Sequence, residues 1–175
     1  TKFATGGEMH VEGGTEISGY AAVFGARDHG GDVVERGAYA ASLTRMAARG
    51  GRIKMLWQHE AKEPIGVWDE VREDERGLWV RGRVLPEVAR GREAAALLAA
   101  GAIDGLSIGY RTVKATRDDD GTRRLRELDL WEVSLVTFPM LSEARVGAKG
   151  TSSGDVYLRD LARAFRQASE AMGRG

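Results

Sequence analysis

The chain has 175 residues, and its 26 basic and 26 acidic side chains balance, so no net charge draws it to nucleic acid or to an anionic membrane. It contains no cysteine, which excludes disulfides, zinc–thiolate sites and a thiol nucleophile. No apolar run approaches the ~20 residues that cross a bilayer and no signal-peptide pattern opens the chain, so we expect a soluble cytoplasmic protein. The chain starts at Thr1 rather than at methionine, which suggests a processed or trimmed start.

Apolar periodicity and turn residues predict mostly strands in the first half of the chain. The expected elements, in order, are strands 8–12 and 16–24, a surface loop 25–32, a helix 36–49, a strand 52–58, and a hairpin of strands 65–73 and 78–85. The helix is expected to end at the Gly50-Gly51 pair, since glycine commonly closes helices.

The second half combines a helix with two long strands. Pro86 is placed to open an alanine-rich helix that runs to about Ala100, and strands follow at 106–116 and 122–138. Residues 148–154 are small and polar, which indicates a linker between a main domain, 1–147, and a C-terminal amphipathic helix, 155–175. That helix is expected either to pack on its own domain or to contact a partner, through the apolar face of Tyr157, Leu161, Ala164, Phe165, Ala168 and Met172.

These elements predict an α+β domain. Strands joined by short turns pair with their neighbours in the chain, so we expect an antiparallel sheet of about seven strands, closed into a β-barrel with flanking helices.

Three segments carry residues with catalytic chemistry. Ser107 lies in the run GLSIGY, residues 105–110, where glycines flank it at a distance of two; alone, this is a weak signal. His59 ends the apolar run MLWQH, whereas His10 and His29 lie in glycine-rich, polar surroundings. The third segment, DLWEVSLVTFP at 129–139, places acids in a strand too apolar to be exposed on both faces.

Two groups of acids also invite a metal interpretation. Asp28, His29 and Asp32 lie close together, but the glycines around them and the missing fourth ligand favour a surface turn. The run 118–120 suggests calcium, yet Asp-Gly between two strands is a strong hairpin signal, so a turn is favoured there as well. We therefore expect no metal and no cofactor.

Six motifs, in order and spacing, resemble those of the prohead (capsid-maturation) serine proteases of tailed phages and phage-derived particles. They are GYAAVF (19–24), DVVERGAY (32–39), LWQH (56–59), PIG (64–66), GLSIGY (105–110) and WEVSLVTFP (131–139). Any one of them is weak, but six in register make the resemblance specific. It covers about residues 15 to 147.

The resemblance implies an assemblin-like fold, as in the herpesvirus protease: a β-barrel that carries helices. It also implies a protease that removes the scaffolding part of the major capsid protein inside the immature head. Carried over by position, the family's histidine is His59 and its serine is Ser107. Herpesvirus enzymes use a second histidine as third member, and here Glu132 fills that position, with Asp129 as its competitor.

The chemistry of these residue types agrees with this assignment. A serine hydroxyl needs a base to take its proton, histidine can take and return a proton near neutrality, and a carboxylate behind the imidazole fixes its tautomer. Alternation places Glu132 on one face with Leu130, Ser134, Val136 and Phe138, where a lone charge would be costly. A salt bridge to an arginine is the alternative role for Glu132. Residues 140–141 are candidates for an oxyanion-hole N–H donor.

Two other functions stay open at this stage. One is a non-catalytic capsid or scaffold component that kept the fold. The other is a metal-dependent hydrolase that uses His59 with Asp28, His29 and Asp32. The expected partner is the major capsid protein with its scaffolding segment, without nucleic acid or membrane; homo-oligomerisation is open. The expected place of action is the prohead in the cytoplasm of the bacterial host.

Overall fold

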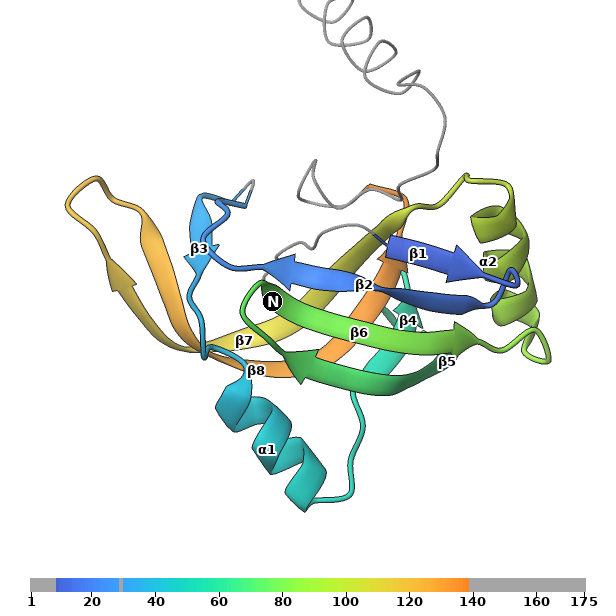
Figure 1. The fold of residues 1–175 in the computed structure, drawn as a ribbon, viewed down its shortest axis with the longest axis horizontal. Helices are drawn as coiled ribbons and strands as arrows, with labels where there is room; N and C mark the ends of the chain where they lie inside the picture. The colour runs from blue at the N-terminus through green and yellow to red at the C-terminus, as the bar shows by residue number, and fades with distance from the viewer. Residues whose placement is uncertain (1–8, 29, 139–175) are drawn as a thin grey trace, which may run out of the picture.

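The computed structural model describes residues 9–28 and 30–138. Within them, one strongly curled sheet wraps around the apolar core, and two helices pack against it (Figure 1). The elements in chain order are β1 (Met9–Glu12), β2 (Glu16–Val23), β3 (Asp32–Val34), α1 (Ala40–Ala48), β4 (Lys54–Trp57), β5 (Glu60–Glu73), β6 (Gly77–Val84), α2 (Ala89–Ala99), β7 (Gly105–Arg117) and β8 (Arg123–Val136). The largest fully buried side chains include Tyr39, Tyr110, Met55, Ile65, Leu78, Ile108 and Leu128.

The sheet has eight strands over the described residues, in the order β1-β2-β6-β5-β4-β8-β7, and β3 pairs with one end of β8. The α+β class is therefore confirmed, but the expectation of a closed, wholly antiparallel barrel is wrong. Both β3 and β4 run parallel to β8, and no hydrogen-bonded ladder joins β7 back to β1 or β2 in the described part. Hairpin turns specify only strands that follow one another in the chain, so they do not predict the long-range parallel pairs.

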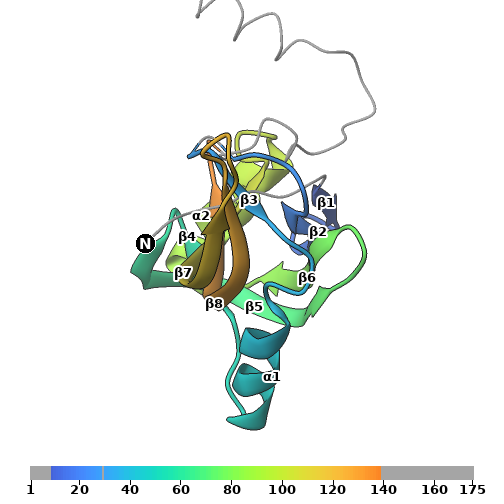
Figure 2. The ribbon, with the colours of Figure 1, turned by 90° about the vertical axis from the view of Figure 1, so that its left-hand side faces the viewer.

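Both predicted hairpin turns are confirmed. At the β5–β6 turn the Asp74 carboxylate accepts the backbone N–H groups of Arg76 and Gly77, at 2.9 and 3.2 Å. At the β7–β8 turn Gly121 has φ +83° and donates its N–H to the carbonyl of Asp118 at 2.9 Å. The second hairpin projects from the body of the sheet, and in Figure 2 it points toward the viewer.

Helix α1 begins at Ala40, four residues later than predicted, because the chain turns at Gly37 with φ +89°. The carboxylate of Glu73 on β5 accepts the backbone N–H groups of Gly37 and of Tyr39, the latter at 3.0 Å, and so satisfies donors at the helix start. Ser42 then fixes the helix to β8, since its hydroxyl accepts the N–H of Leu130 at 2.9 Å.

The loop 25–32 is not a simple surface turn, because Asp28 and Asp32 are buried. The N–H of Asp32 donates to Asp28 Oδ1 at 2.8 Å, and Asp32 Oδ2 pairs with Arg123 at 2.9 Å. The Asp32 carboxylate thus ties β3 to β8, and the Asp28 carboxylate fixes the loop that leads into β3, a short strand that the sequence analysis missed. A local sequence pattern does not show whether an acid in a glycine-rich loop is buried beside a partner from a distant part of the chain.

Several predictions lie outside the described residues: the linker 148–154, the helix 155–175, the domain boundary at 147 and the oxyanion donors at 140–141. No helix in the part that the structure describes is long and apolar enough to span a membrane.

Candidate active site

Strand β8 lies between the two segments that carry the predicted serine and histidine. On one side β7 pairs with it antiparallel and places Ser107 opposite Ser134. On the other side β4 pairs with it parallel and leads directly into His59. The structure therefore brings together all three predicted residues: Ser107 on β7, Glu132 on β8, and His59 in the turn that follows β4.

The three side chains form a continuous hydrogen-bonded chain. His59 Nδ1 lies 2.7 Å from Glu132 Oε1, and His59 Nε2 lies 3.0 Å from the hydroxyl oxygen of Ser107. An ionised carboxylate can only accept, so Nδ1 carries the imidazole proton and Nε2 is left to accept the Ser107 hydroxyl proton. This is the tautomer that a general base requires.

Burial differs along this chain of residues. Glu132 is 4% exposed and Ser107 is 2% exposed, whereas the side chain of His59 retains 20% of its surface. A buried carboxylate is stable only with partners. The partners of Glu132 are His59 through Oε1 and the hydroxyl of Ser134, which donates to Oε2. In the described part, no ion pair joins Glu132 to an arginine.

Gly109 creates the space that Glu132 occupies. It stands opposite Glu132 in the β7–β8 ladder, and a Cβ at Gly109 would lie 2.1 Å from Glu132 Oε1. Only glycine fits there without displacing the carboxylate. Glycine inside a strand often marks a close approach of another group, but the sequence pattern does not connect Gly109 with Glu132.

A β-bulge in β8 sets the direction of Glu132. Gly109 pairs with Glu132 and the next residue, Tyr110, pairs with Leu130, so Trp131 is an extra residue between the two pairs. The expectation that Glu132 and Leu130 share a face is therefore wrong, because Leu130 pairs with Tyr110 and lies in the core. Ser134, two residues after Glu132, does share its face, as its hydrogen bond to the carboxylate requires.

Asp129, the competitor for the third position, is committed elsewhere. Its carboxylate oxygens pair with Arg45 at 3.4 Å and with Arg111 at 3.0 Å, and its side chain is 32% exposed. Glu132, not Asp129, contacts His59.

His59 lies in a tight turn with unusual backbone angles. Trp57 at the end of β4 pairs with Glu60 at the start of β5, and the two residues between them, Gln58 and His59, have φ +48° and +64°. A two-residue hairpin turn with two positive φ values normally contains Asn-Gly or Gly-Gly. Such left-handed angles cost roughly 1–3 kcal/mol each for other residues, so the surrounding structure must hold them.

Gln58 ties this turn to the end of β8. Its backbone N–H donates to the carbonyl of Leu135 at 2.9 Å, and its side-chain amide donates to the hydroxyl of Thr137 at 2.6 Å. The amide oxygen of Gln58 also accepts the N–H of Thr137 at 3.3 Å. Sequence patterns did not predict the hydrogen bonds between Gln58 and Thr137, because residues so far apart in the chain share no local pattern.

The metal alternative finds no support among the described residues, which contain no cluster of three or more His, Cys, Asp or Glu able to hold a metal ion. Asp28 and Asp32 are occupied by the contacts that hold β3, and His29 lies outside the described residues.

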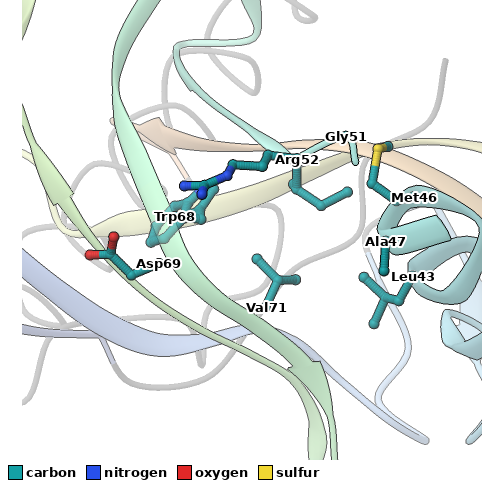
Figure 3. Close-up of a pocket in the computed structure, with 9 residues that line it drawn as sticks. Leu43, Met46, Ala47, Gly51, Arg52, Trp68, Asp69 and Val71 are labelled. Atoms are coloured by element: carbon teal, nitrogen blue, oxygen red, sulfur yellow. The ribbon is translucent and has the colours of Figure 1, made fainter. Parts of the chain in front are cut away.

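A pocket of about 320 Å³ between α1 and β5 is separate from the three candidate residues (Figure 3). Its walls are mostly apolar, and its charged members are Arg52 and Asp69. The lining residues are Leu43, Met46, Ala47, Gly51, Arg52, Ile53, Trp68, Asp69 and Val71. None of them is a nucleophile or a histidine, so the pocket has no catalytic constellation of its own.

Comparison with known proteins identifies the family of this chain. The sequence matches the Caudovirus prohead serine protease family over residues 6–157. The prohead protease of Enterobacteria phage HK97 is 32% identical over 152 residues, which are 83% of this chain and 64% of that protein, so the chain spans somewhat less than two thirds of this relative. The capsid assembly protease of bacteriophage T4 has a similar fold, with a TM-score of 0.59 at 15% identity, over 78% of this chain and 91% of that chain. The family match covers most of the sequence, and the chain therefore belongs to the Caudovirus prohead serine protease family.

Proposed function

We propose that this chain is a serine endopeptidase that cleaves the scaffolding portion of the major capsid protein, and itself, during prohead maturation. In this proposal Ser107 is the nucleophile, His59 the general base and acid, and Glu132 the residue that orients His59. The observation that carries it is the hydrogen-bonded chain Glu132–His59–Ser107, with distances of 2.7 and 3.0 Å. Membership of a prohead protease family, and relatives named for prohead and capsid assembly proteolysis, support the choice of substrate.

The first half of the reaction forms an acyl-enzyme. His59 Nε2 takes the hydroxyl proton as Ser107 Oγ forms a bond to the carbonyl carbon of the substrate, and the carbonyl oxygen becomes an oxyanion. The Glu132 carboxylate, at 2.7 Å from Nδ1, stabilises the imidazolium that results. The imidazolium then gives its Nε2 proton to the amide nitrogen, the C–N bond breaks, and the amine product leaves.

The second half releases the acid product by the same groups. His59 takes a proton from a water molecule, and the hydroxide so formed attacks the ester carbon. The bond to Ser107 Oγ breaks, the proton returns to that oxygen, and the original state is restored. The 20% exposure of the His59 side chain is consistent with solvent reaching the base.

The deciding experiment is co-expression of the chain with the major capsid protein of the same phage, followed by mass measurement of both proteins. We expect the wild type to shorten the capsid protein and Ser107→Ala to leave it at full length, because loss of the nucleophile costs about 10⁴-fold or more in rate. Asp129→Asn is the matched control for a change near the site and is expected to cleave normally. Cleavage by Ser107→Ala at the wild-type level would contradict the proposal.

Two alternatives give different outcomes in the same experiment. A non-catalytic component leaves the capsid protein intact in every variant. A metal-dependent hydrolase loses activity in a chelator, whereas we expect the serine mechanism to be insensitive to it. The masses also report self-cleavage, which we propose for the small-residue segment 148–154, since such segments are accessible to proteolysis.

A further inference from the structure

The second carboxylate oxygen of Glu132 has a dedicated partner that catalysis by a triad does not require. Oε1 accepts the His59 Nδ1–H at 2.7 Å, and Oε2 accepts the hydroxyl of Ser134. Glu132 is 4% exposed and Ser134 is fully buried. In such a place a carboxylate oxygen without a donor would lack both protein and solvent contacts, so this hydrogen bond stabilises one orientation of the carboxylate.

Two serines face the same site, and their contacts assign them different roles. Ser107 and Ser134 are direct cross-strand partners, so their side chains stand next to each other on one face. The Ser107 hydroxyl reaches His59 Nε2 at 3.0 Å, whereas the Ser134 hydroxyl donates to Glu132. A hydroxyl that donates its proton to a carboxylate is not aligned with the base, so Ser134 is not the nucleophile.

The gap at Gly109 explains why the carboxylate needs this support. Glu132 extends over Gly109, where no side chain confines it, and its three rotatable bonds would allow several positions. Ser134 lies two residues further along β8, on the same face, and restrains the oxygen that does not contact His59.

From this arrangement we infer that Ser134 is a positioning residue, which holds Glu132 and through it the tautomer and direction of His59. The functional chain of hydrogen bonds is then Ser134–Glu132–His59–Ser107. The inference rests on the proposed function, since it assigns a role relative to the same nucleophile.

The test measures how fast a fluorophosphonate, a reagent that reacts with activated serines, labels Ser107. This rate reports nucleophile activation and does not require the natural substrate. We expect Ser134→Ala to label about tenfold more slowly, with an unchanged concentration for half-maximal rate, because positioning affects the chemical step and not reagent binding. Ser42→Ala is the matched control: Ser42 is also buried and hydrogen-bonded, to Leu130 of β8, and its loss should leave the labelling rate within about twofold of wild type.

A double-mutant cycle separates positioning from a general structural effect. In the Glu132→Gln background, Ser134→Ala should slow labelling no further, since the residue it acts through is already altered. A tenfold effect that persists in that background would overturn the inference, as would a wild-type labelling rate in Ser134→Ala itself.

Two further results distinguish a failure of this inference from a failure of the proposed function and from a loss of folding. If the wild type does not label at Ser107, the proposed function fails, whatever Ser134 does. If Ser134→Ala loses its cooperative thermal transition, Ser134→Cys replaces it, since a thiol has nearly the same shape but is a weak donor. That variant should label several-fold more slowly than wild type, and equal rates would refute the role.

Discussion

Gly109 and Glu132 face each other across the β7–β8 ladder, and the carboxylate of Glu132 occupies the space that any side chain at 109 would fill. The position of the candidate orienting group is therefore set by the absence of a side chain on the neighbouring strand. This relationship makes the first prediction.

Gly109→Ala should displace Glu132 and slow fluorophosphonate labelling of Ser107 at least about tenfold, with a loss of roughly 1–3 kcal/mol in the free energy of unfolding from overpacking. Gly77→Ala is the control, because its Cβ would lie 2.0 Å from the carbonyl oxygen of Ala22, in the β2–β6 ladder. It should cost similar stability in urea unfolding but retain labelling. Equal labelling by the two variants would contradict the role of the gap.

His59→Ala should be nearly as severe as Ser107→Ala in peptide hydrolysis, because members of a catalytic triad act as a unit. Glu132→Gln should lower kcat by about 10²-fold or more, since an amide can no longer hold the required tautomer as a carboxylate does.

Asp129→Asn should leave kcat unchanged and alter unfolding free energy by about 0.5 kcal/mol or less, since its partners Arg45 and Arg111 are exposed. A severe defect at Asp129 with a mild one at Glu132 would reverse the assignment of the third member.

Two substitutions at Gln58 separate the cost of its left-handed backbone angle from the contribution of its contacts with Thr137. Gln58→Ala removes the contacts with Thr137 but keeps a side chain at φ +48°, whereas Gln58→Gly removes the contacts and relieves the angle. We expect both to slow labelling, and Gly to be more stable than Ala by about 1 kcal/mol in urea unfolding. Equal stabilities would show that the left-handed angle is not maintained in solution.

Asp74 makes stability depend on pH. Partial burial acts to raise the pKa of Asp74, but the N–H groups of Arg76 and Gly77 and the hydroxyl of Tyr20 outweigh it, so the pKa lies below its ordinary value. A lowered folded-state pKa contributes stability that is present above the unfolded pKa and is lost as pH falls through the folded pKa.

Asp74→Asn should therefore cost about 1 kcal/mol in unfolding free energy near neutral pH, and the difference from wild type should shrink as the pH falls below about 4, the ordinary pKa of an aspartate. The exposed Asp119 of the other hairpin is the control for loss of a turn carboxylate, and Asp119→Asn should change the unfolding free energy near neutral pH by about 0.5 kcal/mol or less. A difference for Asp74→Asn that stays constant with pH would rule out the carboxylate as its origin.

Sequence reasoning reached the three side chains of the site because each lies in a locally recognisable segment. His59 ends an apolar run, Ser107 lies between strand glycines, and Glu132 lies in the mostly apolar run 130–136. Their convergence depends on the parallel pairing of β4 with β8, which no local pattern predicts. The six motifs supplied this connection, because their resemblance to a family implies that these three residues belong to one site.

The features that were missed have physical reasons. Alternation cannot locate the bulge at Trp131, because one extra residue changes the face of every residue before it. The turn at Gln58 and His59 lacks the glycine or asparagine that usually indicates positive φ, since tertiary contacts hold it instead.

The separation in sequence of His59, Ser107 and Glu132 limits when the candidate site can form as the chain is synthesised. His59 contacts Glu132 across 73 positions and Ser107 across 48, and β8 is the last strand that the structure describes. A nascent polypeptide that still lacks β8 has a serine and a histidine but nothing to align them. The three candidate groups therefore cannot come together before β8 has been synthesised and has paired with both β4 and β7.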